Sequence, residues 1–294
     1  MKKPITKHDH FQRWLKPAVL LLLCVRSVFG ADAAWQVYTN WPFDPAEAAR
    51  RQAETAQATK QLVVLKTPLG EKDGPVLTWH LIPAGRFIIG SPATEQGHEG
   101  DERQRPVTIS EPFYMMETQL TVGQYRALMQ AEPSDAGDGS DPQLPAGILY
   151  RDTVDSVLPA LARLSPAGWK VILPDHARLE YAARAGVATM NPGGERPEDA
   201  APFAWTRENS GNKVHPVKQK RPNAWGLHDV IGNRWHWFWR EGAGYGNDSV
   251  KDHFVYGATF RAESGGNGAR LANIMISDKP EGARFALIRE DSAP

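Results

Sequence analysis

Glycine and proline interrupt this sequence at short intervals from about residue 62 to its end. The 294 residues include 26 glycines and 23 prolines, a larger share than ordinary globular domains carry. Short β-type runs such as PVLTWHLIPAG (75–85) and RFIIGS (86–91) lie between these turn residues, as strands lie between loops. After residue 186 no long periodic segment is present. The sequence therefore predicts a loop-rich α+β domain with few regular elements.

The first 33 residues have the layout of an export signal. A stretch rich in basic residues precedes the eight-residue apolar run from Ala18 to Val25, and small residues follow at 31–33. Such a run is too short to span a bilayer, which takes about 20 residues, and its flanks are those of a cleaved signal. A short interfacial anchor is the alternative. We expect the mature chain to be periplasmic or extracellular, with no integral membrane segment.

Removal of residues 1–33 changes the charge balance and the cysteine count. The full chain has 34 basic and 34 acidic residues. The first 33 residues hold six of the former and two of the latter, so the mature chain has 28 against 32 and a net charge of −4. Such a chain has no general electrostatic attraction to nucleic acid or to anionic lipid. Cys24 is the one cysteine of the sequence, so the mature chain is expected to contain no thiol.

The predicted helices are short and well separated. Asp44 and Pro45 begin an alanine-rich helix within residues 34–75, which we interpret as an N-terminal helical arm and linker. Further helices are expected over 122–129 (capped by Thr121), 155–164 and 175–185.

Several longer motifs lie between 82 and 288. They are IPAGRFIIGSPATEQGHEGDERQRPVTISEPFYMMETQLTVGQYRALM, LPDHARLEYAARAG, FAWTRENSGNKVHPVKQKRPNAWGLHDVIGNRWHW, VYGATF and ARFALI. Together they resemble the formylglycine-generating enzyme (sulfatase-modifying factor) family, and the third resembles the family pattern nearly residue for residue. We interpret residues 76–290 as one domain of this kind. The resemblance implies an irregular, loop-rich α+β fold, similar to the C-type-lectin-like fold, whose loops are often stabilised by calcium.

The chemistry of the family does not carry over to this chain. The resemblance implies a copper site of two cysteines that oxidises a sulfatase cysteine to formylglycine. The matching segment RAESGGNGARLANI (261–274) contains no cysteine. Copper(I) needs soft thiolate or thioether ligands, which Glu263, Ser264 and Asn267 cannot supply. The sequence therefore predicts no copper and no formylglycine-generating activity.

The resemblance also implies a calcium site in the segment GLHDVIGNRWHW. Its ligands would be Asp229 and the backbone carbonyls of Gly232 and Arg234, but His236 stands where the family has a glutamate. The imidazole removes an oxygen ligand and a charge, so at most a weakened calcium site is expected. Protonation of His236 is expected to replace part of the positive charge beside Asp229, so that stability rises as the pH falls. A transition-metal site that adds His228 is the alternative, without the spacing of a zinc motif.

The stretch GNRWHWFWR (232–240) places tryptophans at alternate positions, 235, 237 and 239. The matching positions of Trp235 and Trp237 face the domain interior in the family, so we expect these two indoles in the core. Trp239 lies beyond the family motif and is the expected surface aromatic. The candidate ligand surface consists of Trp239, Arg240, Arg261, Asn267 and Arg270.

Two classes of function remain open on the sequence. The first is an exported binding or accessory protein that kept the fold, lost the copper site, and recognises an unknown protein or carbohydrate ligand through its loops. The second is an enzyme of the same superfamily with cysteine-independent chemistry, for which the sequence names no catalytic residue. A titratable group in a deep pocket favours the enzyme, whereas a shallow apolar patch favours the binding protein. We favour the binding protein.

Overall fold

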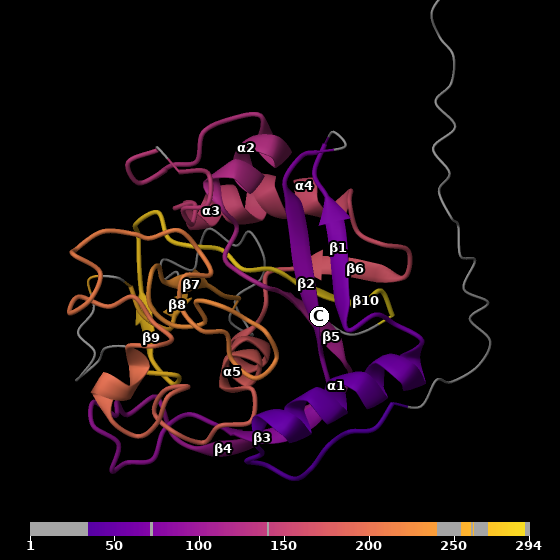
Figure 1. Cartoon of the computed structure of the whole chain (residues 1–294), viewed down its shortest axis with the longest axis vertical. Helices are drawn as coiled ribbons and strands as arrows, with labels where there is room; N and C mark the ends of the chain where they lie inside the picture. Colours follow the sequence, from indigo (N-terminus) through magenta and orange to yellow (C-terminus); the bar gives the residue numbers. More distant parts are fainter. Residues whose placement is uncertain are drawn as a thin grey trace, which may run out of the picture. The chain divides into compact units, whose positions relative to one another are not determined.

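The largest sheet among the described residues is five-stranded and antiparallel (Figure 1). The computed structural model describes residues 35–70, 73–139, 141–239, 254–259, 261 and 270–291. The strands of the sheet are β1 (Val64–Pro68), β2 (Val76–Ile82), β5 (Phe113–Met116), β10 (Ala286–Arg289) and β6 (Trp169–Ile172), in this spatial order. Strand β10, near the end of the chain, therefore lies inside the sheet between β5 and β6.

The helices occur close to where the sequence predicts them. They are α1 (Pro45–Thr59), α2 (Val122–Met129), α3 (Tyr150–Asp152), α4 (Leu158–Ala162) and α5 (His176–Arg184). Asp44, Thr121 and Asp175 each accept a hydrogen bond from a backbone N–H in the first turn of their helix, as N-caps do. The helix expected over 155–164 starts earlier, since a π-helical turn (Thr153–Val157) joins α3 to α4.

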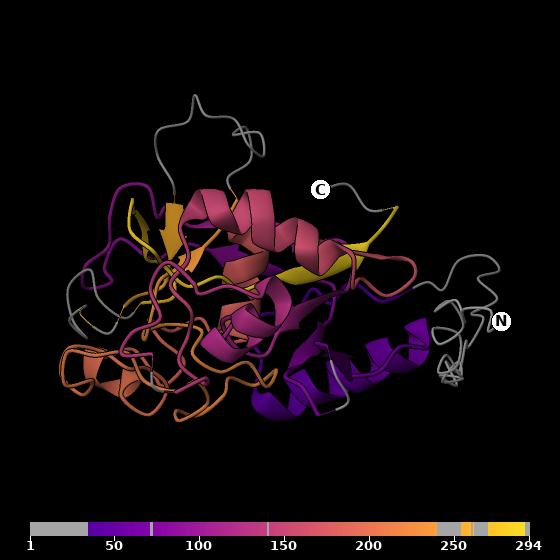
Figure 2. The same ribbon diagram turned by 90° about the horizontal axis from the view of Figure 1, so that it is seen from above.

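The side chains of the sheet alternate between two hydrophobic clusters. Phe113 and Met115 of β5 belong to one cluster, whereas Tyr114 and Met116 belong to the other, because successive side chains of a strand point to opposite faces. The first cluster includes residues of α5, and the second includes residues of α4. In Figure 2, α4 and α1 lie on opposite sides of the sheet.

The N-terminal arm is packed onto the domain. The Gln52 side chain of α1 donates hydrogen bonds to the carbonyls of Leu81 (2.9 Å) and Trp225 (3.3 Å). Strand β1 falls within the residues 34–75 that the sequence assigned to arm and linker, yet it pairs with β2 along its whole length. The described residues therefore belong to one compact unit.

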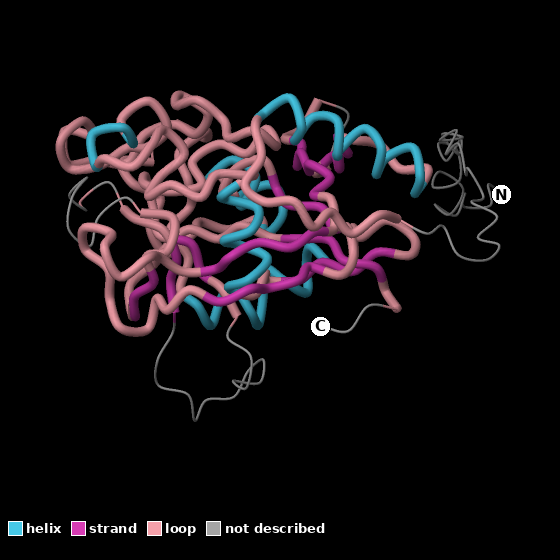
Figure 3. The backbone as a smooth tube through the Cα atoms, turned by 90° about the horizontal axis from the view of Figure 1, so that it is seen from below, coloured by secondary structure: helices cyan, strands magenta, loops and turns pink. Residues whose placement is uncertain are grey.

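Two smaller sheets and many loops complete the domain. One sheet pairs β3 (Gly85–Ile89) with β4 (Arg105–Ile109), and the other contains β7 (His236–Trp237), β8 (Phe254–Tyr256) and β9 (Ile274–Ile276). Figure 3 shows how much of the chain around them is loop. The prediction of a loop-rich α+β domain is confirmed. Within the described residues, none of the helices is both long enough and apolar enough to cross a membrane.

Candidate functional site

A cleft of about 330 Å³ opens beside Trp239, and a volume of this size suits a small ligand. Three parts of the fold line it: the first turn of α5, the β3–β4 hairpin with its connecting loop, and the chain around β7, β8 and β9. Figure 1 shows α5, β3, β4 and β9 in the same half of the domain. Residues far apart in the sequence therefore form this cleft.

One wall of the cleft is aromatic. Phe238 and Trp239 follow β7, and Phe254 begins β8. The Phe238 ring lies 5.9 Å from the Phe254 ring and 5.3 Å from the imidazole of His176, measured between centroids. Trp239 is half-buried, and its backbone N–H donates to the Pro174 carbonyl at 2.9 Å, which fixes it beside the start of α5. Such a wall suits a flat apolar group.

Several other residues that line the cleft are charged. Arg103 and Arg105 are exposed, and neither guanidinium has an ion-pair partner in the described part of the chain. Asp101 is exposed as well. Asp175 also lines the cleft, but its carboxylate is already used, because it caps α5 and pairs with the guanidinium of Arg178. The uncommitted charges at the cleft are therefore mostly positive.

His176 lines the cleft with a buried carboxylate behind it. Its Nε2 lies 3.0 Å from Oε2 of Glu180, one helical turn later. The other oxygen of Glu180 accepts hydrogen bonds from the N–H of Gly90 (2.9 Å) and from Nε of Arg184 (2.8 Å). Burial raises the pKa of Glu180, but Arg184 and His176 outweigh it and hold that pKa below its usual range. A buried carboxylate that is held by Gly90 and Arg184 thus lies next to the imidazole at the border of the cleft.

The sequence alone does not single out His176, Arg103 or Arg105 as site residues. Weak signals exist for all three. His176 precedes Glu180 by four positions on a capped helix, which places both on one helix face. Arg103 and Arg105 are two residues apart at the start of an extended strand, so their side chains share one side. Neither pattern says that the two segments meet at the same cleft.

The predicted ligand surface is brought together in part. Trp239 lines the cleft, whereas the exposed Arg261 is not among its lining residues. Arg240 and Asn267 lie outside the described residues.

Arg270 requires a correction, because its side chain is fully buried. The guanidinium pairs with Glu95 at 3.2 Å and with Glu102, and it also donates to the Gly97 carbonyl. These partners lie on the loop between β3 and β4. Arg270 therefore fixes that loop from inside and cannot contact a ligand at the surface.

Most polar groups of the turn expected to bind calcium make other contacts, and Oδ1 of Asp229 is its one buried side-chain oxygen without a hydrogen-bond partner among the described residues. Asp229 is buried, and its Oδ2 accepts the N–H of Lys218 at 2.9 Å. The Arg234 carbonyl accepts from Nε2 of Gln119 at 2.7 Å, and His236 Nε2 donates to the Asp229 carbonyl at 3.0 Å. Calcium takes about six to eight oxygen ligands, and this turn offers an imidazole and few free oxygens, so its residues fit calcium poorly. No group of three His, Cys, Asp or Glu suited to a metal occurs among the described residues.

A buried guanidinium lies beside this turn and changes the role of His236. Arg284 donates to four backbone carbonyls, those of 116, 117, 228 and 229. Burial holds the pKa of His236 well below its ordinary value, and the nearby Arg284 lowers it further. His236 is therefore neutral, and the expectation that its protonation supplies a positive charge is wrong. Because the folded state resists protonation, this residue makes stability fall, not rise, below about pH 6.5.

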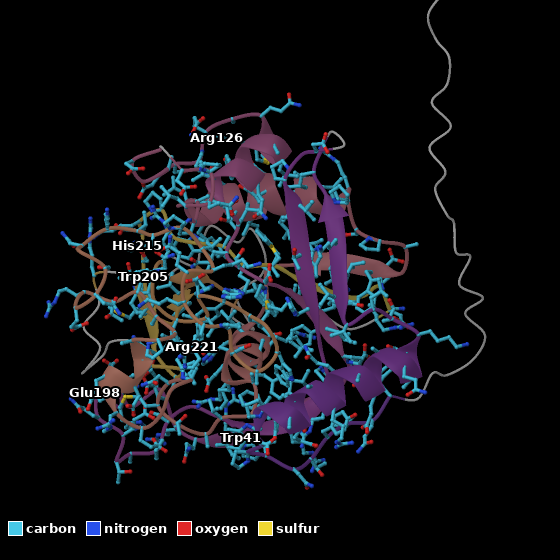
Figure 4. The ribbon with its side chains drawn as sticks, in the orientation of Figure 1. Trp41, Arg126, Glu198, Trp205, His215 and Arg221 are labelled. Carbon is cyan, nitrogen blue, oxygen red and sulfur yellow. The ribbon has the colours of Figure 1, made fainter. Side chains whose placement is uncertain are left out.

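Ring stacking and close packing explain much of the motif over 203–237. The rings of Trp205 and His215 stack with centroids 3.8 Å apart (Figure 4), and Nζ of Lys220 lies 4.0 Å from the Trp205 ring centre. Gly232 has a φ of +78°, and a Cβ there would lie 2.6 Å from the Trp205 carbonyl oxygen, so this position needs glycine. These residues hold loops together rather than open a site.

Glu281 is expected to make the stability of the domain depend on pH. Burial raises the pKa of this carboxyl to about 7, although Ser277 and Arg234 oppose the shift. Below about pH 4.5 both the folded and the unfolded states keep the proton, and stability is lost as the pH rises through 7. Glu281→Gln removes the ionisation and should stabilise the chain at pH 8 by up to about 3 kcal/mol, with little change at pH 4.5. Urea unfolding at both values measures this.

The matched control for Glu281 is the exposed Glu290. Glu290→Gln should change the free energy of unfolding by less than about 0.5 kcal/mol at either pH. Equal stabilisation by Glu281→Gln at pH 4.5 and pH 8 would contradict the raised pKa.

The loop-rich fold and the motif over 203–237 together indicate one class of protein, the one that the sequence resembles. Comparison with models of known families gives the same class. Residues 70–284 match the model of the sulfatase-modifying factor enzyme 1-like domain. The chain therefore belongs to the sulfatase-modifying factor family. A comparison with curated protein sequences gives no significant match.

Solved structures show the same fold. PvdO from Pseudomonas aeruginosa is 25% identical with a TM-score of 0.61, over 76% of this chain and 99% of its own. Treponema denticola variable protein 1 is 18% identical with a TM-score of 0.60, over 77% and 99%. CarF is 19% identical with a TM-score of 0.51, over 71% and 97%. At these identities the similarity establishes the fold of this chain and not its activity.

Proposed function

We propose that this chain is an exported member of the family that does not carry out copper-dependent oxidation and instead binds a ligand in the cleft beside Trp239. The ligand is a small molecule or a segment of a protein or glycan partner. The cleft itself carries this proposal, because aromatic side chains and two exposed arginines line the same cavity. This combination can bind and orient a ligand without any catalytic group.

The cysteine content supports the loss of the oxidase reaction. Cys24 is the single cysteine of the sequence, and the segment 261–274 that matches the copper-binding segment has none. Copper(I) is held by soft sulfur ligands, and neither the carboxylates nor the imidazole at the cleft are of that kind.

Incubation of the purified chain with copper(I), oxygen and a sulfatase-motif peptide should therefore yield no formylglycine. Mass spectrometry of the peptide measures the outcome, and a family member with both copper-binding cysteines is the positive control. A mass change on the peptide cysteine that grows with turnover would refute this part of the proposal.

Export is supported by the order of basic, apolar and small segments in residues 1–33. N-terminal sequencing of exported protein is expected to start near Ala31 or Ala34. Exported material that begins at Met1 would show that the segment is not cleaved.

An enzyme with cysteine-independent chemistry is the second candidate, and one observation favours it. His176 borders the cleft, and the buried Glu180 lies 3.0 Å behind its Nε2. An imidazole oriented by a carboxylate can accept or donate a proton. The test is to incubate a ligand of the cleft with the parent chain and with His176→Gln. Conversion by the parent, together with binding but no conversion by the variant, would show that the chain is an enzyme. A ligand recovered unchanged from the parent chain would support binding alone.

A further inference from the structure

We propose that the cleft selects a ligand that joins a flat apolar ring to an anionic group, with Arg103 and Arg105 as the residues that bind the anion. This inference rests on the proposed binding function and names the chemical class of its ligand. The proposed loss of copper chemistry does not say which ligand the cleft prefers, whereas this inference does.

The position of the two arginines carries the argument. Arg105 is the first residue of β4, which pairs with β3 so that Arg105 lies opposite Ile89. Arg103 precedes it by two residues, and Ser91 pairs with Arg103 in an isolated bridge. Alternate residues of an extended segment share one side, and both arginines line the cleft. The backbone thus presents two guanidinium groups toward one ligand.

These guanidinium groups remain available because nearby acidic residues are already paired. Glu102, directly before Arg103, is buried against Arg270 and also accepts a hydrogen bond from the Ser91 hydroxyl at 2.6 Å. Asp175, on the α5 side of the cleft, is held by Arg178. Asp101 is the acidic lining residue that stays exposed. The exposed charges that line the cleft are thus two guanidinium groups and one carboxylate, that of Asp101. The net positive electrostatic potential favours an anionic ligand.

The apolar wall sets the shape of the rest of the ligand. Phe238 is buried, and Trp239 and Phe254 are half-buried where they border the cleft. Ile274 of β9 continues this wall. Aromatic faces stack on flat rings, and burial of apolar area supplies the affinity that an exposed ion pair alone does not.

Two dyes of nearly the same shape test the proposal. The probes are 8-anilinonaphthalene-1-sulfonate, which carries an anion, and N-phenyl-1-naphthylamine, which is uncharged. Fluorescence titration of the purified chain should give tighter binding of the sulfonate. The Arg103→Gln/Arg105→Gln variant should weaken the sulfonate about tenfold, which is about 1.4 kcal/mol, and leave the uncharged dye within about twofold. The advantage of the sulfonate should also shrink as salt is added.

Control variants separate the two levels of the proposal. Arg163→Gln/Arg221→Gln removes two exposed arginines outside the cleft and should change neither dye. Trp239→Ala should weaken both dyes, because it removes part of the shared wall. If the cleft arginines do not affect the sulfonate while Trp239→Ala weakens both, the anion selectivity is wrong and the binding cleft stands. If Trp239→Ala changes neither dye, the proposed binding function of the cleft is wrong.

Discussion

Trp237→Ala is expected to cost about 3–5 kcal/mol of the free energy of unfolding, the range for a buried large side chain cut back to alanine. Trp237 is 0% exposed. Its Nε1 donates to the Ile148 carbonyl at 2.7 Å, and its ring packs edge-on against Tyr150 at 5.5 Å between centroids. The substitution opens a cavity and leaves the Ile148 carbonyl without that donor. Chemical denaturation of parent and variant measures the difference.

Trp239→Ala is the matched control, because the same side chain is removed two residues later. Trp239 is half-buried at the cleft, so its loss should cost less than about 2 kcal/mol. A cost under about 1 kcal/mol for Trp237→Ala would mean that the indole is exposed in solution. Residues 232–240 would then be a candidate binding surface.

The roles of these tryptophans could be predicted from the sequence because they depend on local pattern. Trp235 and Trp237 fall on positions that the family motif buries, and both are buried here. The caps at Asp44 and Thr121 were also predictable, since a cap requires one side chain and the turn that follows it. The density of glycine and proline correctly indicated a loop-rich domain.

The cleft could not be predicted in the same way. Arg103, His176 and Trp239 lie on three segments that meet through the tertiary fold, and no spacing in the sequence records this. Short-range patterns can place a side chain on a face of a helix or strand, but they do not say which other segment lies opposite that face.

The error on His236 has a similar cause. The local motif shows an imidazole where the family has a carboxylate, and a protonated ring is a reasonable substitute for a lost cation. The guanidinium of Arg284 reaches the same turn from 48 positions further along the chain and donates to the Asp229 carbonyl at 3.2 Å. A fixed cation nearby makes a second positive charge on His236 unfavourable. Charge at a buried site depends on all the groups that surround it.

Arg270 illustrates the same limit, because its acidic partners Glu95 and Glu102 come from a distant loop. Arg270→Met should destabilise the chain by about 3–5 kcal/mol, because it keeps most of the apolar stem but leaves buried acidic groups without their cation. Glu102 is 2% exposed and Glu95 is 5% exposed at the side chain. Burial already raises the pKa of Glu95, with Arg270 opposing the shift, so its charged form depends on the guanidinium. Urea unfolding at pH 7 measures the cost.

A second substitution identifies the origin of that cost. Glu102→Gln in the Arg270→Met background removes the orphaned carboxylate and should restore about 1–3 kcal/mol, since the amide oxygen can still accept from the Ser91 hydroxyl. Arg196→Met is the control: its guanidinium pairs with Asp199 at 2.8 Å but is 69% exposed, so the loss should stay under about 1 kcal/mol. If Arg270→Met costs no more than this control, Glu102 is reached by water and the loop between β3 and β4 is not fixed from inside. Because Glu102 also borders the cleft, that result would remove the rigid support that Arg103 needs to meet a ligand.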